Sequence, residues 1–124
     1  MATILIKDGY IVSMNPAREI IPGGFLAVEG DRITYVGKGE PEGGLASYDA
    51  VIDARGMIVL PGLINMHQHH WYNLLKGLGD GLTLDEWFTE LALPAFAHIE
   101  DADLRVSMYL ACLEMIQTGT TCWA

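Results

Sequence analysis

The fold is decided by nine residues, Pro61-Gly62-Leu63-Ile64-Asn65-Met66-His67-Gln68-His69. The Pro-Gly pair favours a turn, and the apolar residues behind it predict a short strand over residues 63–67. Because successive side chains of a strand point to opposite faces, His67 and His69 are expected to share one face at its carboxyl end. Two such imidazoles can reach one metal ion, and zinc accepts neutral histidine nitrogen. A His-x-His pair also occurs as two polar residues at a strand–loop junction, so the pair alone leaves both interpretations open.

The residues after this stretch alternate between helix and strand patterns. Thr83 and Glu86 have the spacing of a capping box, which predicts a helix that starts there. That helix is expected to end before Pro94, because proline lacks the N–H that a helix needs in its interior.

A longer helix is predicted over residues 101–118, with Asp101 as its cap and Gly119 beyond its last turn. Residues 120–124 resume a strand pattern, so strand, helix and strand follow one another as in a βαβ unit with parallel strands. Apolar residues at helical spacing predict the buried stripe of this helix: Leu104, Met108, Cys112 and Met115.

Residues 1–60, which precede the stretch, consist of short β-rich runs separated by turn signals. Asp8-Gly9 predicts a hairpin between strands at residues 3–7 and 10–14, because both residues tolerate positive φ. Gly30-Asp31 predicts a second hairpin of the same kind. This half of the chain is therefore expected to form a sheet.

The composition indicates a globular protein and excludes two kinds of partner. The chain has 124 residues, of which 51% are hydrophobic and 19% are charged. Seven Lys and Arg face sixteen Asp and Glu, which gives a net charge of −9. Nucleic acid and anionic membranes both attract Lys and Arg, so neither is expected as a partner.

The cysteines and the hydropathy pattern point to the cytoplasm. Two cysteines, Cys112 and Cys122, are too few for a disulfide framework. No uncharged apolar stretch approaches the ~20 residues of a membrane helix, and the run Ile4-Leu5-Ile6 is too short for a signal peptide.

The stretch at residues 61–69 closely resembles the signature of the amidohydrolase superfamily, in which Pro-Gly and an apolar strand precede a metal-binding His-x-His. Residues 28–33 and 51–57 resemble that superfamily's opening strands. Segments similar to those of its deaminase-like members are Leu75-Lys76-Gly77, Leu84-Asp85-Glu86-Trp87-Phe88 and Gly119-Thr120-Thr121. The resemblance therefore covers essentially the whole chain.

The resemblance implies an α/β fold with two parts. Residues 1–60 would be the amino-terminal part of a small, composite β-sandwich. Residues 61–124 would be the first βα units of an incomplete (β/α)₈ TIM-like barrel, whose site lies at the carboxyl ends of the strands.

The resemblance also implies roles for individual residues. His67 and His69 would bind one divalent metal ion, with zinc expected first and iron as the alternative. The remaining ligands and the acid–base groups have no counterpart in this sequence, so no catalytic residue is expected within it. Trp87 and Phe96 would contact the substrate, although a core role is the alternative for Trp87. Adenine-nucleoside deaminases usually carry Glu, which bonds ribose, where Phe96 stands, so Phe96 indicates free bases such as 8-oxoguanine, or triazines.

The function implied is that of a metal-dependent hydrolase of carbon–nitrogen bonds other than peptide bonds. We expect an aminohydrolase that deaminates a small heterocyclic substrate, such as a purine base or triazine, with metal-activated water. The 124 residues alone are expected to be inactive, and to self-associate through residues 63–124 or form part of a longer polypeptide or homo-oligomer. The alternatives are a non-catalytic binding or assembly module and a small metal-binding protein that uses His67, His69 and His70.

Overall fold

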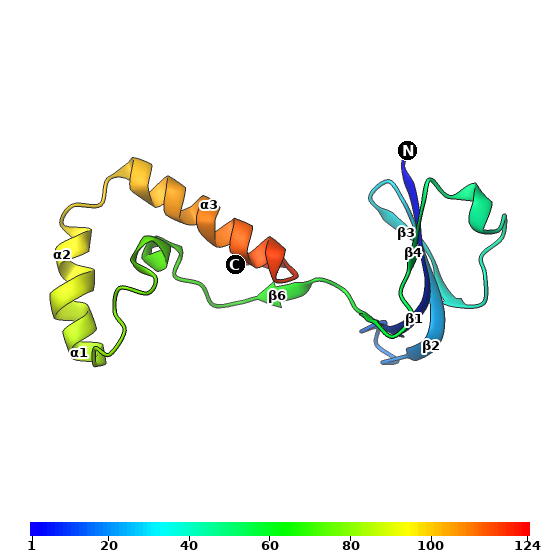
Figure 1. Ribbon diagram of the computed structural model, residues 1–124, viewed down its shortest axis with the longest axis horizontal. Helices are drawn as coiled ribbons and strands as arrows, with labels where there is room; N and C mark the ends of the chain where they lie inside the picture. Colours follow the sequence, from blue (N-terminus) through cyan, green and yellow to red (C-terminus); the bar gives the residue numbers. More distant parts are fainter. The chain divides into compact units, whose positions relative to one another are not determined.

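The chain forms two compact units, Met1–Pro61 and Gly62–Ala124, in the computed structural model, which describes all 124 residues (Figure 1). The first unit is mainly a β-sheet. The second contains two short parallel strands and most of the helices. The fold class is α/β, as the sequence predicts.

The first unit is a five-stranded sheet in the order β3-β2-β1-β4, with β5 also paired to β1. Its strands are β1 (Thr3–Val12), β2 (Ile20–Glu29), β3 (Arg32–Lys38), β4 (Ala50–Asp53) and β5 (Ile58–Val59), and a 3₁₀ turn, η1 (Leu45–Ser47), precedes β4. β1 is antiparallel to β2 and parallel to both β4 and β5, so it is the central strand. The fully or nearly buried apolar residues of this unit are Leu5, Ile11, Ala27 and Ala54.

The predicted hairpin at Asp8-Gly9 is wrong, because β1 runs straight through these residues. Asp8 does adopt a positive φ of 59°, but the chain uses it for an irregularity within the strand. The pairing of β1 with β2 shifts register on both sides of Gly9. A Cβ on Gly9 would lie 2.7 Å from Cγ2 of Val59, so the missing side chain allows β5 to approach. The second predicted hairpin is confirmed, with Glu29 opposite Arg32.

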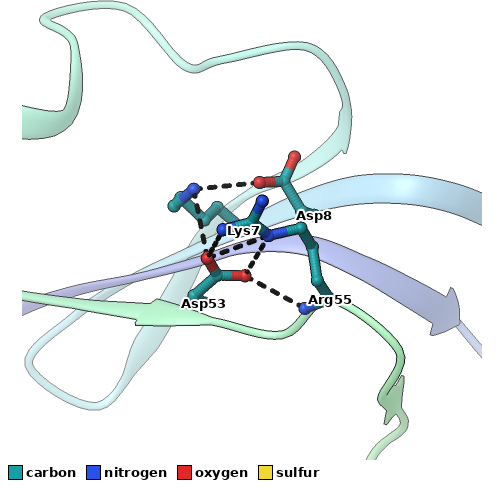
Figure 2. Close-up of polar contacts among 4 residues, drawn as sticks. All are labelled: Lys7, Asp8, Asp53 and Arg55. Atoms are coloured by element: carbon teal, nitrogen blue, oxygen red, sulfur yellow. Dashed lines mark hydrogen bonds and ion pairs between the residues drawn. The ribbon is translucent and has the colours of Figure 1, made fainter.

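Four charged residues join β1 to the β4–β5 turn, as Figure 2 shows. The Arg55 side chain donates to both carboxylate oxygens of Asp53, at 2.5–3.1 Å, and its backbone N–H donates at 3.1 Å. Lys7 Nζ lies 2.9 Å from Asp8 Oδ2 and 3.6 Å from Asp53 Oδ2. The hydrogen bonds from Arg55 hold the pKa of Asp53 far below its ordinary value.

The second unit is a βαβ arrangement, as the sequence predicts. β6 (Leu63–Asn65) pairs in parallel with β7 (Thr120–Trp123). The elements between them are η2 (His70–Leu75), α1 (Leu84–Glu86), a π-helical turn η3 (Trp87–Ala92), α2 (Leu93–Phe96) and α3 (Asp101–Gln117). No helix of the chain has both the length and the apolar character needed to cross a membrane.

The capping box at Thr83 and Glu86 is confirmed, but the predicted end of the helix before Pro94 is wrong. The Thr83 N–H donates to Glu86 Oε2 at 2.8 Å, and the Glu86 N–H donates to Thr83 Oγ1 at 3.4 Å. Helical backbone then continues to Phe96. The turn before Pro94 is π-helical, with the Leu93 N–H bonded to the carbonyl of Phe88, five residues back. This wider turn accommodates a proline that an α-helical ladder would exclude.

The long helix α3 differs from its prediction at its start and in its buried face. Its cap is Glu100 rather than Asp101, and the Glu100 N–H donates to Asp103 Oδ2 at 3.0 Å. Gly119, at φ 87°, lies beyond its end as predicted. The buried residues are Ser107, Ala111 and Met115. In the predicted stripe, Met115 is correct, Cys112 is half-buried, and Leu104 and Met108 are exposed. The helix is apolar on several sides, so apolar spacing alone does not identify its buried face. That face contains the small residues Ser107 and Ala111, which allow close packing against η2.

Candidate metal centre

The His67 and His69 side chains lie close together, although not for the reason that the sequence suggests. β6 ends at Asn65, two residues earlier than predicted, so both histidines lie in the loop between β6 and η2. Strand alternation therefore cannot align them. Their ring centroids are nevertheless 4.9 Å apart, with the ring planes at 76°, and both residues are exposed.

The loop is organised by the side chain of Asn65. Its Oδ1 accepts a hydrogen bond from the backbone N–H of His67 at 3.1 Å. Its Nδ2 donates to Oε1 of Gln68 at 3.1 Å. An Asn that binds the backbone two residues ahead forms an Asx-turn, which reverses the chain locally. This turn, rather than the alternation of side chains along a strand, brings the two histidines together.

The separation of the two rings fits a shared metal ion. Imidazole nitrogens bind zinc at about 2.0–2.1 Å in tetrahedral geometry, which places two ring centres roughly 5 Å apart. The observed 4.9 Å agrees with that value. The chain brings no third His, Cys, Asp or Glu to the pair. The residue types and the ring separation therefore suit two positions of a metal site, and they also match the edge-to-face packing of two rings.

His70 is anchored to the rest of the unit rather than directed to the same point. The buried hydroxyl of Ser107 in α3 donates to the His70 carbonyl. The His70 ring contacts Trp123 of β7 edge-on, with centroids 4.6 Å apart. Its Nδ1 is buried without a hydrogen-bond partner. These contacts tie the loop after the histidine pair to α3 and β7.

Tyr72 links the histidine pair to the two predicted substrate residues. Its ring centroid is 5.5 Å from that of His69, 4.8 Å from that of Trp87 and 5.4 Å from that of Phe96. No motif in the sequence singles out Tyr72. The available signal is its position three residues after His69, because a 3₁₀ turn eclipses residues at that spacing. His69, Trp87 and Phe96 thus meet in one aromatic cluster.

An open hollow of about 360 Å³ lies beside this cluster. Tyr72 and Trp87 form its aromatic part, and Lys76 and Asp80 contribute charge. Gly79 is needed for its shape, because a Cβ there would lie 2.5 Å from Cδ1 of Trp87. Trp87 is half-buried and Phe96 is 37% exposed, so both rings keep accessible surface.

The chain is similar over its whole length to curated deaminases. It is 40% identical over 124 residues to a 5'-deoxyadenosine deaminase of Methanococcoides burtonii. It is 41% identical over 127 aligned positions to a 5-methylthioadenosine/S-adenosylhomocysteine deaminase of Moorella thermoacetica. In both cases the match covers 100% of this chain and 28% of the relative, so the chain spans little more than a quarter of their length. No family model matches the chain.

Solved structures give the same picture of the fold. A zinc-bound adenosine deaminase from Xanthomonas campestris superimposes with a TM-score of 0.78 at 28% identity, over 98% of this chain and 28% of that one. An atrazine chlorohydrolase from Arthrobacter aurescens, complexed with zinc, gives 0.78 at 24% identity, over 97% of this chain and 28% of that one. The resemblance to the amino-terminal portion of amidohydrolase-type barrel proteins is therefore confirmed.

Proposed function

We propose that this chain is the amino-terminal part of a metal-dependent hydrolase of carbon–nitrogen bonds other than peptide bonds, and that the whole protein deaminates a nitrogen heterocycle. The observation that carries the proposal is the 40% identity to a deaminase across all 124 residues. The 4.9 Å separation of the His67 and His69 rings supports it, because that pair supplies ligands suited to zinc.

In this proposal His67 and His69 hold one divalent metal ion, and zinc is favoured because two solved neighbours contain it. When bound, the metal supplies activated water at neutral pH. The two imidazoles must be neutral to bind it, and Asn65 fixes the backbone from which the first of them projects. The other ligands and the acid–base groups would come from outside these residues, so the 124 residues alone are expected to be inactive.

The aromatic cluster supports a flat heterocyclic substrate. Tyr72, Trp87 and Phe96 offer ring faces and edges close to His69, and a heteroaromatic ring packs well against such surfaces. Phe96 cannot accept a hydrogen bond from a ribose hydroxyl. Although several curated relatives are deaminases of adenosine derivatives, we therefore propose a purine base or a triazine as the substrate.

The wider organisation follows from the same comparison. Residues 1–60 would contribute to a composite β-sandwich, and residues 61–124 would begin a (β/α)₈ barrel. We further propose a homo-oligomer located in the cytoplasm. The free thiols of Cys112 and Cys122 support that location, and the acidic composition argues against nucleic acid and anionic membranes as partners.

The proposal is tested on the intact protein that contains this chain. Zinc content is measured by elemental analysis, and ammonia release is followed with 8-oxoguanine, adenine, an amino-triazine and 5'-deoxyadenosine. We expect bound zinc and turnover of at least one free base or triazine. Turnover of 5'-deoxyadenosine alone would correct the substrate class. Binding of a heterocycle without ammonia release would favour the non-catalytic binding module and overturn the enzyme proposal.

A further inference from the structure

We propose that Asn65 is the positioning residue that sets the relative placement of His67 and His69 for metal binding. The inference rests on the proposed role of the two histidines as metal ligands. It assigns to a non-ligand side chain the control of metal affinity.

The backbone of Asn65 is fixed by its hydrogen bonds to β7 and to the residue that follows that strand. Asn65 is the last residue of β6 and is paired in register with Trp123. Its carbonyl also accepts a hydrogen bond from the Ala124 N–H at 3.2 Å. The chain is therefore anchored up to Asn65 and leaves the sheet immediately afterwards.

The side chain of Asn65 carries this order into the loop. Oδ1 holds the N–H of His67, the first ligand, and Nδ2 holds the side chain of Gln68, which lies between the two ligands. Nδ2 is also 3.7 Å from Sδ of Met115, a residue of α3 that is only 7% exposed. This contact with the helix helps to fix the orientation of the amide group.

No other hydrogen bond restrains residues 66–68. Beyond them, the His69 carbonyl accepts from the Tyr72 N–H at 3.2 Å. The loop is therefore held at its two ends by backbone hydrogen bonds, and between the ends by the side chain of Asn65. Without the Asx-turn, the chain between β6 and η2 can rotate and separate the two imidazoles. Loss of contacts that orient metal ligands typically lowers metal affinity by about 10- to 100-fold.

The chain contains a matched control for this argument in its first unit. Asn15 Oδ1 accepts from the backbone N–H of Glu19 at 3.1 Å, and Asn15 Nδ2 donates to Glu19 Oε2 at 2.6 Å. It therefore makes the same two kinds of bond as Asn65, in a loop that contains no histidine.

The experiment measures zinc affinity of the intact protein by competition with a chromogenic chelator, and thermal unfolding of the zinc-free form. Asn65→Ala is expected to weaken zinc binding by about 10- to 100-fold. Asn65→Asp keeps the oxygen acceptor for His67 and is expected to recover most of that loss. Asn15→Ala is expected to leave the affinity unchanged, and Gln68→Ala, which removes only the Nδ2 bond, to weaken it less than Asn65→Ala.

The outcomes separate this inference from the proposed function. If zinc binding depends on His67 and His69 but Asn65→Ala binds zinc like the wild type, the positioning role is wrong. The Asx-turn mechanism is equally wrong if Asn65→Asp restores the melting temperature but not the affinity, because the oxygen that accepts from the His67 N–H then does not control zinc binding. If zinc binding is unaffected by His67→Ala and His69→Ala, the proposed function fails at its metal site. Should Asn65→Ala not fold, the comparison of Gln68→Ala with Asn15→Ala decides, and equal affinities overturn the inference.

Discussion

Different kinds of internal contact stabilise the two units of the chain. In Met1–Pro61 the strands of the sheet bond one another over long registers, and Leu5 and Ile11 are large, fully buried side chains. In Gly62–Ala124 the strands are short, and the buried residues of the helices are mostly small, namely Ala92, Ser107, Ala111 and Met115. The candidate metal ligands lie in the second unit. Their placement depends on single side-chain contacts, whereas the first unit depends on a repeated ladder.

Apolar side chains are exposed on both units, and those of the first unit include Ile33 at 64% and Ile58 at 65%. On α3, Val106 is 56% exposed and Ile116 is 70% exposed, which leaves apolar area without partners. Apolar area of this kind usually marks a contact surface. It agrees with the proposals that this unit packs against further barrel elements or a second subunit.

The largest expected effect is a loss of activity and zinc caused by changes in the second unit, with the first unit unaffected. In the intact protein, His67→Ala or His69→Ala removes a metal ligand. Because a metal supplies several kcal/mol of transition-state stabilisation, we expect deaminase activity to fall by about 10³-fold or more. Zinc content should fall in parallel, and hydrogen exchange of the β1 amides should not change. His70→Ala should cost less, since its ring packs on Trp123. Equal losses from all three variants would show that the ligand set is misassigned.

The next effect concerns stability and is confined to the first unit. Leu5 has no exposed surface, and truncation of such a leucine to alanine typically costs about 2–5 kcal/mol. We expect Leu5→Ala to accelerate hydrogen exchange in β1, β2 and β4 while the α3 amides remain protected. Loss of protection in both units together would show that they fold as one, and the contrast between them would then be a matter of packing only.

Repeated sequence patterns predict much of the fold correctly. The sheet, the second hairpin, the βαβ order and the capping box all follow from periodicity and turn chemistry. The errors arise where a local signal has two uses. Asp8 has the positive φ of a turn but serves within a strand, and Pro94 is tolerated because a π-helical turn precedes it. In both cases the packing of the surrounding structure, and not the local sequence, determines which conformation forms.

The candidate site shows the same limit. The sequence predicts that the His67 and His69 side chains lie together, and they do, but through the Asx-turn of Asn65 rather than through strand alternation. The contact of Tyr72 with both Trp87 and Phe96 joins residues far apart in the chain. Such a contact depends on how η2 packs against the following helices, and residue spacing does not encode it.

A smaller effect is expected at the start of the first helical run in the second unit. Thr83→Ala removes the capping oxygen that accepts from the Glu86 N–H, and loss of an N-cap typically costs about 1 kcal/mol. We expect a lower melting temperature and earlier fraying of residues 84–96 in hydrogen exchange. Thr83→Ser, which keeps the hydroxyl, is the control. If the serine and alanine variants melt alike, the hydroxyl does not stabilise this helix.

The smallest effect is an acid-dependent one in the first unit. Hydrogen bonds from the Arg55 side chain, and then from its backbone N–H, lower the pKa of Asp53 relative to an unfolded value of about 3.9. A carboxyl group with a lowered native pKa stabilises the fold fully above the unfolded pKa, and this contribution is lost as the pH falls toward the native pKa. The group is exposed to solvent, so screening keeps the contribution small.

The test compares melting temperatures of the wild type and Asp53→Asn between pH 6 and pH 2. The wild type should be the more stable near neutral pH, and the difference should shrink below about pH 4, where an unfolded Asp53 takes up its proton. Asp31→Asn is the control, because Asp31 only approaches the exposed Arg32 at 3.7 Å and should show no such trend. A constant difference between wild type and Asp53→Asn over this range would mean that Asp53 acts through its hydrogen bonds to Arg55 alone and not through its charge. The hydrogen bonds between Asp53 and Arg55 would then order the β4–β5 turn without a contribution from charge. The Asx-turn of Asn65 orders the histidine loop of the second unit in the same way.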